Sequence, residues 1–248
     1  MSLHASHSEG VAAALSGACK FRGLTLPTTL PSEPMGMFCD WLSDAATAKI
    51  MPNPNAFSLA TVNEQGYPAA RIVLCRGVDA PTARIVFYTN YTGRKGKELM
   101  ASGRAAALFH WDALERQVRI EGLVTKSPAA ESDGYFNTRP KASRIAAWAS
   151  DQSEPIGSRA EMEAKQRSCE ERFGVRPGVD LEKDASVVVP RPPHWGGFRL
   201  WAQRVELWLG HPNRLHDRAV WERMLTAATV DGVPGFTGGA WRATRLQP

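Results

Sequence analysis

The chain has 248 residues, of which 43% are hydrophobic and 22% are charged, and this profile is typical of a soluble globular protein. Lysine and arginine number 30 against 25 for aspartate and glutamate, a basic excess that suits phosphorylated small molecules; without a basic run or an aromatic-rich RNA motif, nucleic acid is not an expected partner. The cysteines form no CxxC pair and no apolar stretch reaches membrane-span length, so we expect a cytoplasmic protein without a metal site or a disulfide framework.

The N-terminal half combines one helix with a series of strands. Residues 1–33 are interpreted as a mobile arm, because they lack the basic and long apolar parts of a signal peptide, and residues 34–248 as one domain. Apolar side chains at helical spacing predict an amphipathic helix over 34–49. Further along, the patterns predict strands at 56–62, 69–76, 83–89, 104–111 and 116–126, hairpin connections at 63–66 and 112–115, and a short helix at 93–102.

The second half is helical before strands return. Helices are predicted at 129–139, 143–150 and 158–173. Ser143 is interpreted as the N-cap of the second helix, and Ser158 with Glu161 as the capping box of the third. A loop over 174–194 precedes the strands "GGFRLWA", "RVELWLG" and "WRATRL". Strands with short turns and no regular βαβ alternation predict a mainly β (α+β) antiparallel barrel with peripheral helices, and the absent Rossmann glycine pattern argues against a nicotinamide cofactor.

Four basic residues in the first half favour an anion-binding site. Arg71 and Arg76 bracket one predicted strand, and Arg94 with Lys95 begins the helix that follows Gly93. A helix start presents free N–H groups and the positive end of the helix dipole, so cations there are unfavourable unless an anion compensates them. These residues therefore predict a phosphate cradle, and the alternative is that Arg94 and Lys95 are solvated first-turn residues.

A second group of candidate ligands lies in the helical middle of the chain. Tyr135, Arg139 and Ser143 recur every four residues. Two hydroxyls and a guanidinium could converge on one phosphate across the break at Pro140. Surface packing of Tyr135, an ion pair of Arg139 and simple helix capping would explain the same spacing.

The stretch "NRLHDR" places Arg214, His216 and Arg218 at alternate positions. In an extended segment these side chains share a face, and their mutual repulsion indicates an anion on that face; a solvated hairpin edge is the alternative. Gln117 lies in a strand that is predicted to be buried on one face, where an amide could read the imide edge of a planar ring. Trp208 is interpreted either as core or as a stacking platform.

Several long motifs resemble the pyridoxamine (pyridoxine) 5′-phosphate oxidase family in order and spacing, from about Pro34 to Pro248. They are "RIVLCR", "FYTNYTGRKGKEL", "LERQVRIEG", "YFNTRPKASRIAAWASDQS", "WGGFRL", "VELWLG", "NRLHDR" and the terminal "RLQP". The resemblance implies a split β-barrel homodimer with FMN bound at the subunit interface. It also implies oxidation of pyridoxine 5′-phosphate or pyridoxamine 5′-phosphate to pyridoxal 5′-phosphate, with O2 as the acceptor and H2O2 as a product.

The resemblance implies roles for individual residues as well. FMN would contact Arg71, Ile72, Val73, Leu74, Tyr88, Thr89, Arg94, Lys95, Gln117, Gln152, Ser153, Trp208 and Arg218, drawn from both subunits. The substrate phosphate would contact Arg76, Tyr135, Arg139 and Ser143. Arg214 and His216 would be the catalytic residues that meet the substrate ring beside the flavin. Whether His216 accepts the C4′ proton or only holds the ring is left open by the sequence.

The chain departs from the family pattern at position 76, where the family commonly has lysine and this chain has Arg76. A guanidinium is larger and forked, so affinity for phosphate is expected to differ. The chain also ends in Leu246, Gln247 and Pro248, where the family tail is often Leu-Ala-Pro. Phenazine-pathway oxidases share the barrel, so the alternatives to a vitamin B6 enzyme are an oxidase of another ring and a flavin-binding module without turnover.

Overall fold

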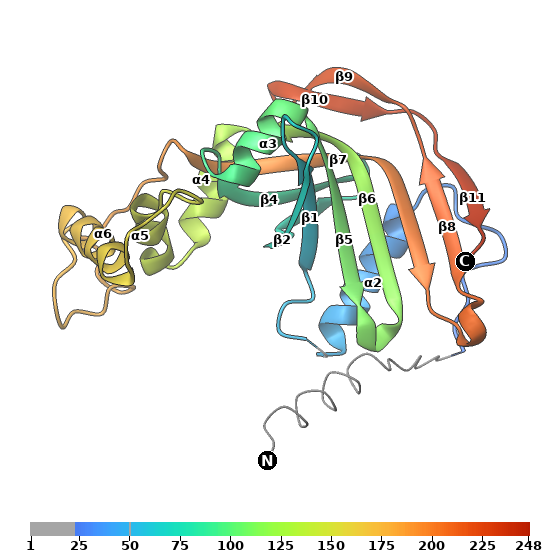
Figure 1. The fold of residues 1–248 in the computed structure, drawn as a ribbon, viewed down its shortest axis with the longest axis horizontal. Helices are drawn as coiled ribbons and strands as arrows, with labels where there is room; N and C mark the ends of the chain where they lie inside the picture. Colours follow the sequence, from blue (N-terminus) through green and yellow to red (C-terminus); the bar gives the residue numbers. More distant parts are fainter. Residues whose placement is uncertain (1–22, 50) are drawn as a thin grey trace, which may run out of the picture.

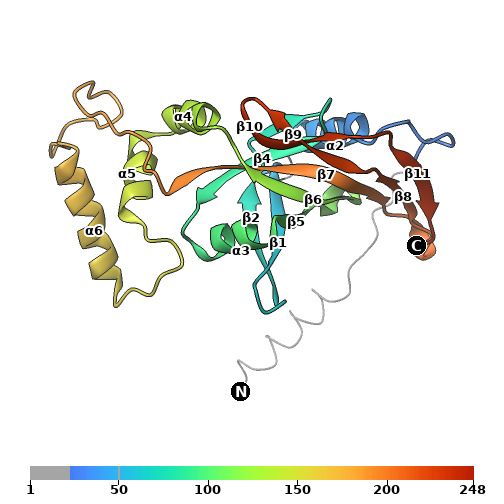
Figure 2. The same cartoon turned by 90° about the horizontal axis from the view of Figure 1, so that it is seen from above.

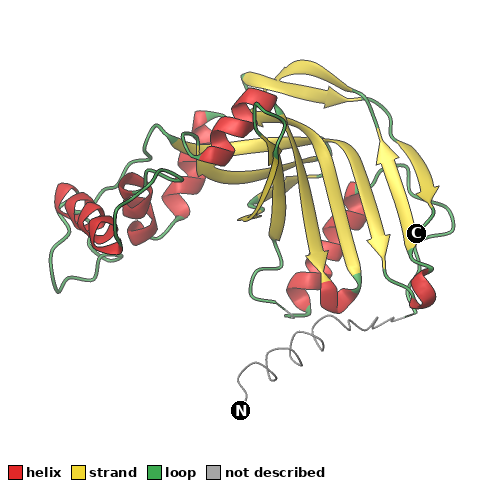
Figure 3. Ribbon diagram, viewed as in Figure 1, coloured by secondary structure: helices red, strands yellow, loops and turns green. Residues whose placement is uncertain are grey.

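A long antiparallel sheet, curled into a half-barrel, forms the centre of the structure (Figures 1 and 3). The structure is a computed structural model that describes residues 23–49 and 51–248. The strand order is β11-β8-β7-β6-β5-β1-β2, with β4 paired to β7 and β3 paired to β4. The strands are β1 (Ala56–Val62), β2 (Pro68–Leu74), β3 (Gly77–Asp79), β4 (Arg84–Asn90), β5 (Arg104–Trp111), β6 (Arg116–Lys126), β7 (Trp195–Leu209), β8 (Asp217–Glu222) and β11 (Arg242–Leu246), and a separate hairpin is formed by β9 (Leu225–Val230) and β10 (Val233–Gly238).

The helices lie around the sheet, as Figure 2 shows from above. One of them packs into the half-barrel, where the Phe38 ring centroid lies 5.0 Å from that of Phe109. Two others extend beyond one end of the sheet and pack on each other (Figure 1). The helices are α2 (Met35–Thr47), α3 (Arg94–Ser102), α4 (Ala129–Thr138), α5 (Lys141–Ala149) and α6 (Arg159–Arg172), with short 3-10 turns at η1 (Asp112–Leu114) and η2 (Pro212–Arg214).

Aromatic side chains fill the space that the curled sheet encloses. Phe57, Phe87 and Phe109 are fully buried, and the Phe57 centroid lies 5.8 Å from that of Phe87 and 5.1 Å from that of Phe109. Along β1, buried residues alternate with partly exposed ones, as expected for a strand with one face in the core. This alternation fixes the register of β1, because a slip of one residue would turn its core side chains outward.

Most predicted elements of the first half are confirmed. The strands at 56–62, 104–111 and 116–126 have the predicted bounds, and the other two are shifted by one or two residues. Both hairpin connections and the helices at 34–49 and 93–102 are also confirmed. The mainly β, antiparallel fold with peripheral helices is therefore the one that the patterns predict.

The prediction of two strands over "GGFRLWA" and "RVELWLG" is wrong, because β7 is a single strand of 15 residues. Its pairing with β6 shifts register between Glu121 and Gly122. A Cβ atom at Gly122 would lie 1.9 Å from the carbonyl oxygen of Trp201, so only glycine allows the strands to approach this closely. Strands β3, β8, β9 and β10 were not predicted from the sequence.

Two local predictions in the second half are also wrong. Ser143 is not an N-cap: α5 begins at Lys141, and its N-cap is Pro140. "NRLHDR" is not extended throughout, because η2 ends at Arg214 and the φ angles of Asn213 and Arg214 are +57° and +60°. Arg214 therefore does not share a strand face with Arg218.

The helix α6 begins as predicted, with one difference in its capping. The Ser158 hydroxyl accepts a hydrogen bond from the backbone N–H of Glu161 at 3.1 Å. The Glu161 carboxylate accepts from the backbone N–H of Gly157 at 3.0 Å, one residue before the partner that a capping box would give it.

The predicted N-terminal arm lies mainly outside the described residues. Its described part runs beside the C-terminal strands. The backbone N–H of Leu26 donates to Asp217 at 2.9 Å, and the Trp221 indole donates to the carbonyl of Pro31 at 2.8 Å. These contacts attach the chain before α2 to β8.

Candidate active site

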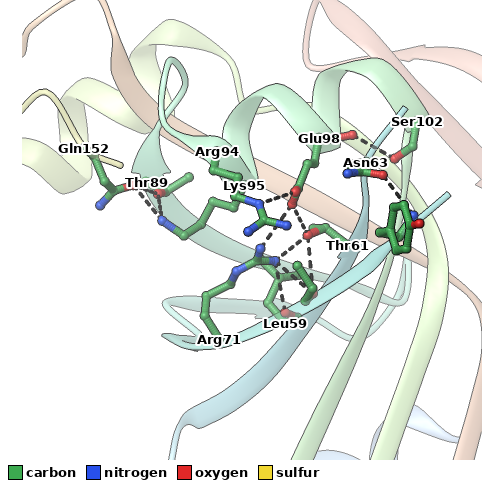
Figure 4. A network of polar contacts seen from close by, with 12 residues as sticks. Leu59, Thr61, Asn63, Arg71, Thr89, Arg94, Lys95, Glu98, Ser102 and Gln152 are labelled. Carbon is green, nitrogen blue, oxygen red and sulfur yellow. Dashed lines mark hydrogen bonds and ion pairs between the residues drawn. The ribbon is translucent and has the colours of Figure 1, made fainter. Parts of the chain in front are cut away.

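The start of α3 brings two predicted cofactor residues beside a third (Figure 4). Arg94 and Lys95 form its first turn, and the Arg71 side chain of β2 reaches the same helix through an ion pair with Glu98 at 3.1 Å. The N-cap, Gly93, provides no side-chain cap. Free N–H groups and cations at one helix start are the arrangement that favours a bound anion.

A buried carboxylate, which sequence reasoning missed, joins these groups. The Glu98 side chain is 5% exposed and accepts from Arg94 Nε at 2.8 Å and from the Thr61 hydroxyl at 2.5 Å. Desolvation acts to raise the pKa of Glu98, but hydrogen bonds from Thr61, Arg94 and Arg71 outweigh it and hold the pKa below its ordinary value. Glu98 is therefore an anion that orients Arg71 and Arg94. Its spacing of four from Arg94 was the available signal.

Lys95 points the other way along the helix start, toward two further predicted cofactor residues. Its Nζ donates to the Gln152 side-chain oxygen at 2.6 Å and to the Thr89 hydroxyl at 3.3 Å. Among the described residues, it forms no ion pair. Desolvation and then the nearby charge of Arg71 lower the pKa of Lys95. A partly desolvated ammonium without an acidic partner is suited to receive an anion.

The remaining predicted cofactor residues of this region flank the cluster. Ser153 follows Gln152 and is exposed, with a φ angle of +75°. Val73 packs against the core, whereas Ile72 is 67% exposed. Residues 71–74 belong to β2, which ends the strand path of the main sheet. Among the described strands, β2 pairs with β1 alone, so the backbone groups of its other edge could meet a ligand or another chain.

A stack of aromatic rings holds the predicted substrate-phosphate residues. The Tyr88 ring lies 4.1 Å from Tyr135 and 5.4 Å from Trp195, with the planes within 16° of parallel. The guanidinium carbon of Arg139 lies 4.8 Å from the Trp195 centroid, and that of Arg76 lies 5.7 Å from the Tyr135 centroid. The structure therefore gathers three of the four predicted residues, from α4, from its C-cap and from the turn after β2, around rings of β4 and β7.

The charge in this group is not balanced. Among the described residues, neither Arg76 nor Arg139 forms an ion pair, and Arg139 Nη1 is buried without a hydrogen-bond partner. Desolvation is the main cause that lowers the pKa of Arg139, and the charge of Arg76 acts in the same direction. Buried donors are rarely left unpaired, and neighbouring like charges repel. The pair therefore fits an anionic ligand with several acceptor oxygens.

Ser143 lies in the first turn of α5 and is partly buried. The first N–H groups of this helix are not free for a ligand, because the carboxylate of Glu182 accepts from the backbone N–H of Lys141 at 3.0 Å and of Ala142 at 3.3 Å. The N–H groups of Lys141 and Ala142 are therefore not available to the predicted anion site, and Ser143 itself is the residue of this turn that could contribute to it.

A second cluster lies across β6, β7 and β8. Gln117 pairs directly with Trp208, and Trp208 pairs directly with Arg218, so three predicted cofactor residues form one row across the sheet. Arg218 donates from Nη2 and Nε to the buried Glu206, at 2.7 and 3.1 Å. Glu206 is thus a second orienting carboxylate that sequence reasoning missed. The row presents an amide, an indole and a guanidinium on one surface.

One of the two predicted catalytic residues, His216, lies beside the middle of this row. The His216 ring centroid lies 4.6 Å from that of Trp208, and His216 Nδ1 accepts from the backbone N–H of His211 at 3.0 Å. In the neutral ring this bond leaves the proton on Nε2, which is then a donor. Arg214 is exposed in η2, outside the strand.

A cavity of about 1220 Å³ lies elsewhere, between the ends of several strands. Its lining includes Thr61, Arg104, Glu121, Arg204 and Met224, and none of the predicted site residues. The unbalanced cations, rather than this cavity, mark where an anionic ligand would bind, because a desolvated charge needs a counter-ion.

Two regions of the chain match known protein families. Residues 43–173 match the family described as pyridoxamine 5′-phosphate oxidase, and residues 195–248 match a region described as the pyridoxine 5′-phosphate oxidase C-terminal dimerisation region. The chain belongs to the pyridoxamine 5′-phosphate oxidase family. The first match contains the α3 cluster, which comprises Arg71, Arg94, Lys95 and Glu98, and the Tyr88 and Tyr135 rings of the aromatic stack. The second match contains the third ring of the stack and the residues near the C-terminus: Trp195, Trp208, Arg214, His216 and Arg218.

Individual relatives cover most of the chain. A pyridoxine/pyridoxamine 5′-phosphate oxidase of Bordetella pertussis is 46% identical over 227 residues, which is 92% of this chain and 95% of the relative. One of Burkholderia orbicola is 48% identical over 216 residues, 87% of this chain and 89% of the relative. The family to which the chain belongs is thus a family of oxidoreductases.

Solved structures support the fold. The chain superimposes on PhzG from Burkholderia lata, solved with tetrahydrophenazine-1-carboxylic acid, with a TM-score of 0.72 and 29% identity over 88% of this chain and 94% of PhzG. An FMN-binding protein of Nostoc punctiforme gives 0.61 at 16% identity, over 89% of this chain and all of that protein. The predicted split β-barrel is confirmed. In the described part of the chain, no helix is long and apolar enough to span a membrane.

Proposed function

We propose that the protein is an FMN-dependent oxidase that converts pyridoxine 5′-phosphate or pyridoxamine 5′-phosphate to pyridoxal 5′-phosphate, with O2 as the acceptor and H2O2 released. The observation that supports this proposal most is the unbalanced pair Arg76 and Arg139 on the Tyr88–Tyr135–Trp195 stack. This pair is separate from the cations of the α3 cluster, so the chain has two cationic groups. A phosphorylated cofactor and a phosphorylated substrate would require one such group each.

The α3 cluster fits the phosphate of FMN in charge. Arg71, Arg94 and Lys95 supply three cations and Glu98 one anion, which leaves two positive charges. A phosphomonoester carries about −1.5 to −2 charge near neutral pH. The free donors of Arg94 and Lys95 and the uncapped helix start would hold its oxygens, while Thr89 and Gln152 orient the Lys95 ammonium.

When bound, FMN supplies the two-electron redox chemistry and its reoxidation by O2. The chain's own residues bind and orient. Arg76, Tyr135, Arg139 and Ser143 would anchor the substrate phosphate and so restrict how the pyridine ring can lie. Arg214 would contact that ring, and His216 would donate from Nε2 to a polar atom of it, because Nδ1 already accepts from His211. This bond favours His216 as a donor that positions the ring over His216 as the base.

We also propose that two subunits form each site. Residues 71–74 lie in β2 at one end of the strand path, and Arg218 lies in β8, with β7, β6, β5 and β1 between them. Gln117, Trp208 and Arg218 would then face the flavin of the partner subunit, whereas Arg71, Arg94 and Lys95 would hold the flavin of their own. The match of residues 195–248 to a dimerisation region supports this arrangement.

A second candidate is oxidation of another ring. PhzG, which superimposes well on this chain, was solved with a phenazine carboxylic acid, and a carboxylate could also pair with Arg139. A carboxylate carries one negative charge, however, and two neighbouring guanidinium groups are better matched by a phosphate. A third candidate is a protein that binds flavin without catalysing turnover, and an experiment must distinguish it from the two oxidases.

Purified protein tests these possibilities directly. We expect flavin absorbance after reconstitution with FMN, and H2O2 release when pyridoxine 5′-phosphate or pyridoxamine 5′-phosphate is added. Flavin binding with peroxide release only from a reduced phenazine carboxylic acid would support the second candidate. Flavin binding without turnover of any of these would support the third, and a protein that cannot bind FMN would contradict all of them.

A further inference from the structure

Residues 174–194, which lie between α6 and β7, contain no helix or strand. A loop of this length inside a compact domain is usually functional or disordered. Here it is packed: Val187 and Val189 are 3% and 2% exposed and form a small core with Ile145 of α5, which is fully buried. The Trp148 indole donates to the carbonyl of Pro190 at 2.7 Å. We call residues 174–194 the α5 brace.

The α5 brace supplies what the start of α5 lacks. The N-cap Pro140 offers no side-chain acceptor, and the first turn of α5 contains no acidic residue. Glu182 of the brace accepts from the backbone N–H groups of Lys141 and Ala142 at 3.0 and 3.3 Å, with one carboxylate oxygen each. The Lys141 ammonium donates to the backbone carbonyl of Asp184 at 2.6 Å. A carboxylate from a distant segment therefore caps this helix. Its negative charge also interacts favourably with the positive end of the helix dipole.

The start of α5 is in turn bonded to the end of α4. Arg144 donates from Nε to the carbonyl of Arg139 at 2.7 Å and from Nη2 to the carbonyl of Asn137 at 2.6 Å. The hydrogen bonds thus form a continuous path from Glu182 through the first turn of α5 to the backbone of Arg139. The same turn contains Ser143.

We propose that Glu182 is a positioning residue for the substrate phosphate. It fixes the first turn of α5, and thereby the Ser143 hydroxyl and the backbone from which the Arg139 side chain extends. Glu182 forms no ion pair with Arg139 or Arg76, so it acts through the α4–α5 corner and not by contact with the ligand. This inference rests on the proposed function of the site.

The test compares Glu182→Ala and Glu182→Gln with Lys183→Ala. Lys183 is the next residue of the brace, its side chain is 85% exposed, and its ammonium forms an ion pair with Asp180 at 3.0 Å. For each holoenzyme, kcat and KM are measured with pyridoxine 5′-phosphate. The Kd of pyridoxal 5′-phosphate is measured by absorbance titration, and that of FMN by flavin fluorescence.

For Glu182→Ala we expect KM and the Kd of pyridoxal 5′-phosphate to rise together by about 3- to 10-fold, which lies within the roughly 2- to 30-fold that corresponds to loss of a helix N-cap. The kcat and the FMN affinity should stay near wild type, and Glu182→Gln, which keeps one carbonyl acceptor, should lie between. Lys183→Ala should match wild type.

Equal KM and Kd in Glu182→Ala and Lys183→Ala would overturn the inference, and so would a parallel loss of FMN affinity and kcat. If Glu182→Ala does not fold, Glu182→Gln decides by the same measurements. A wild type that binds pyridoxal 5′-phosphate without oxidising its precursors would contradict the proposed function, while the Kd values would still decide the role of Glu182. A wild type that does not bind it would contradict both.

Discussion

The Arg139 guanidinium lies over the face of Trp195, with 4.8 Å between the guanidinium carbon and the ring centroid. An aromatic face attracts a cation without neutralising it, so Arg139 is oriented and partly desolvated yet keeps its full charge. A carboxylate partner in the same place would have to be displaced by a ligand. The aromatic contact therefore orders the guanidinium and leaves it available to an anion.

Replacement of Arg139 tests this role. We expect Arg139→Ala to raise the KM of pyridoxine 5′-phosphate by an amount equivalent to about 2 kcal/mol or more, because a desolvated charge-assisted contact is lost, while FMN stays bound. Steady-state kinetics and flavin content check this. Arg167→Ala, in the exposed part of α6, is the control. An unchanged KM would remove Arg139 from the phosphate site.

Position 76 tests whether charge or fork geometry matters there. Arg76→Lys keeps the charge near the Tyr135 ring but loses the planar fork, so we expect activity to be retained with a change in KM of less than about tenfold. Arg76→Ala should raise KM much more. A change of preferred substrate in Arg76→Lys would instead make this position a specificity determinant.

Lys95 gives FMN affinity a pH dependence. Its pKa is lowered by desolvation and by Arg71, so the free protein loses this charge at a lower pH than an ordinary lysine, whose pKa is 10.5. A bound phosphate favours the charged form; the Kd of FMN should therefore rise as pH increases from about 7 to about 10. Lys95→Gln should weaken FMN binding at neutral pH and remove the dependence of Kd on pH. The control Lys97→Gln, at a side chain that is 61% exposed, should do neither. Fluorescence titration measures both, and a Kd that is independent of pH in the wild type would contradict the role of Lys95.

Arg214 and His216 should affect turnover and not flavin content. For Arg214→Ala we expect a lower kcat with FMN retained. Leu215→Ala is the neighbouring control, because Leu215 is 71% exposed. His216→Phe keeps a ring beside Trp208 and removes the Nε2 donor, so it should also reduce kcat/KM. Wild-type kinetics in both variants would show that this turn does not contact the substrate.

Asp184 of the α5 brace should contribute stability that depends on pH. Hydrogen bonds from Ser186 and Arg176 lower its pKa from 3.8 to about 2. Because the folded-state pKa is the lower one, this contribution is complete above pH 3.8 and is lost as the pH falls through about 2. Asp184→Asn should therefore lower Tm near neutral pH, and the difference from wild type should shrink below pH 3.8. The control Asp112→Asn, at a side chain that is 89% exposed, should show no such trend. If the Tm difference between Asp184→Asn and wild type does not vary with pH, the proposed contribution of an ionised Asp184 is contradicted.

The local patterns of the sequence were sufficient for most elements and for the start of α3. The carboxylates that hold the site residues in place could not be predicted from local patterns, because their contacts are made between segments that lie far apart in the sequence. Glu98 joins Arg94 through a helical spacing of four, but its contacts with Thr61 and Arg71 depend on how α3 lies against two strands. Glu182 caps a helix 41 residues earlier in the chain, and that contact depends on the path of the whole brace.

The interpretation of "NRLHDR" failed for a local reason. Alternation implies a shared face only in extended backbone. Pro212 begins a 3-10 turn, and Asn213 and Arg214 both adopt left-handed φ angles. Asparagine is often found with left-handed φ angles, but arginine seldom is. The residue type at position 214 therefore did not indicate that the backbone leaves the extended conformation there.

Strand β7 begins at Trp195 and contains Trp208 thirteen residues later. At roughly 3.3 Å per residue, about 43 Å of strand length separates the two residues. In the proposed dimer, one tryptophan supports a guanidinium of one reaction centre and the other faces the flavin of the second. A single continuous strand would thus set the spacing of both centres, so an insertion within it would shift both at once, whereas extra residues in the β9–β10 hairpin would leave that spacing untouched.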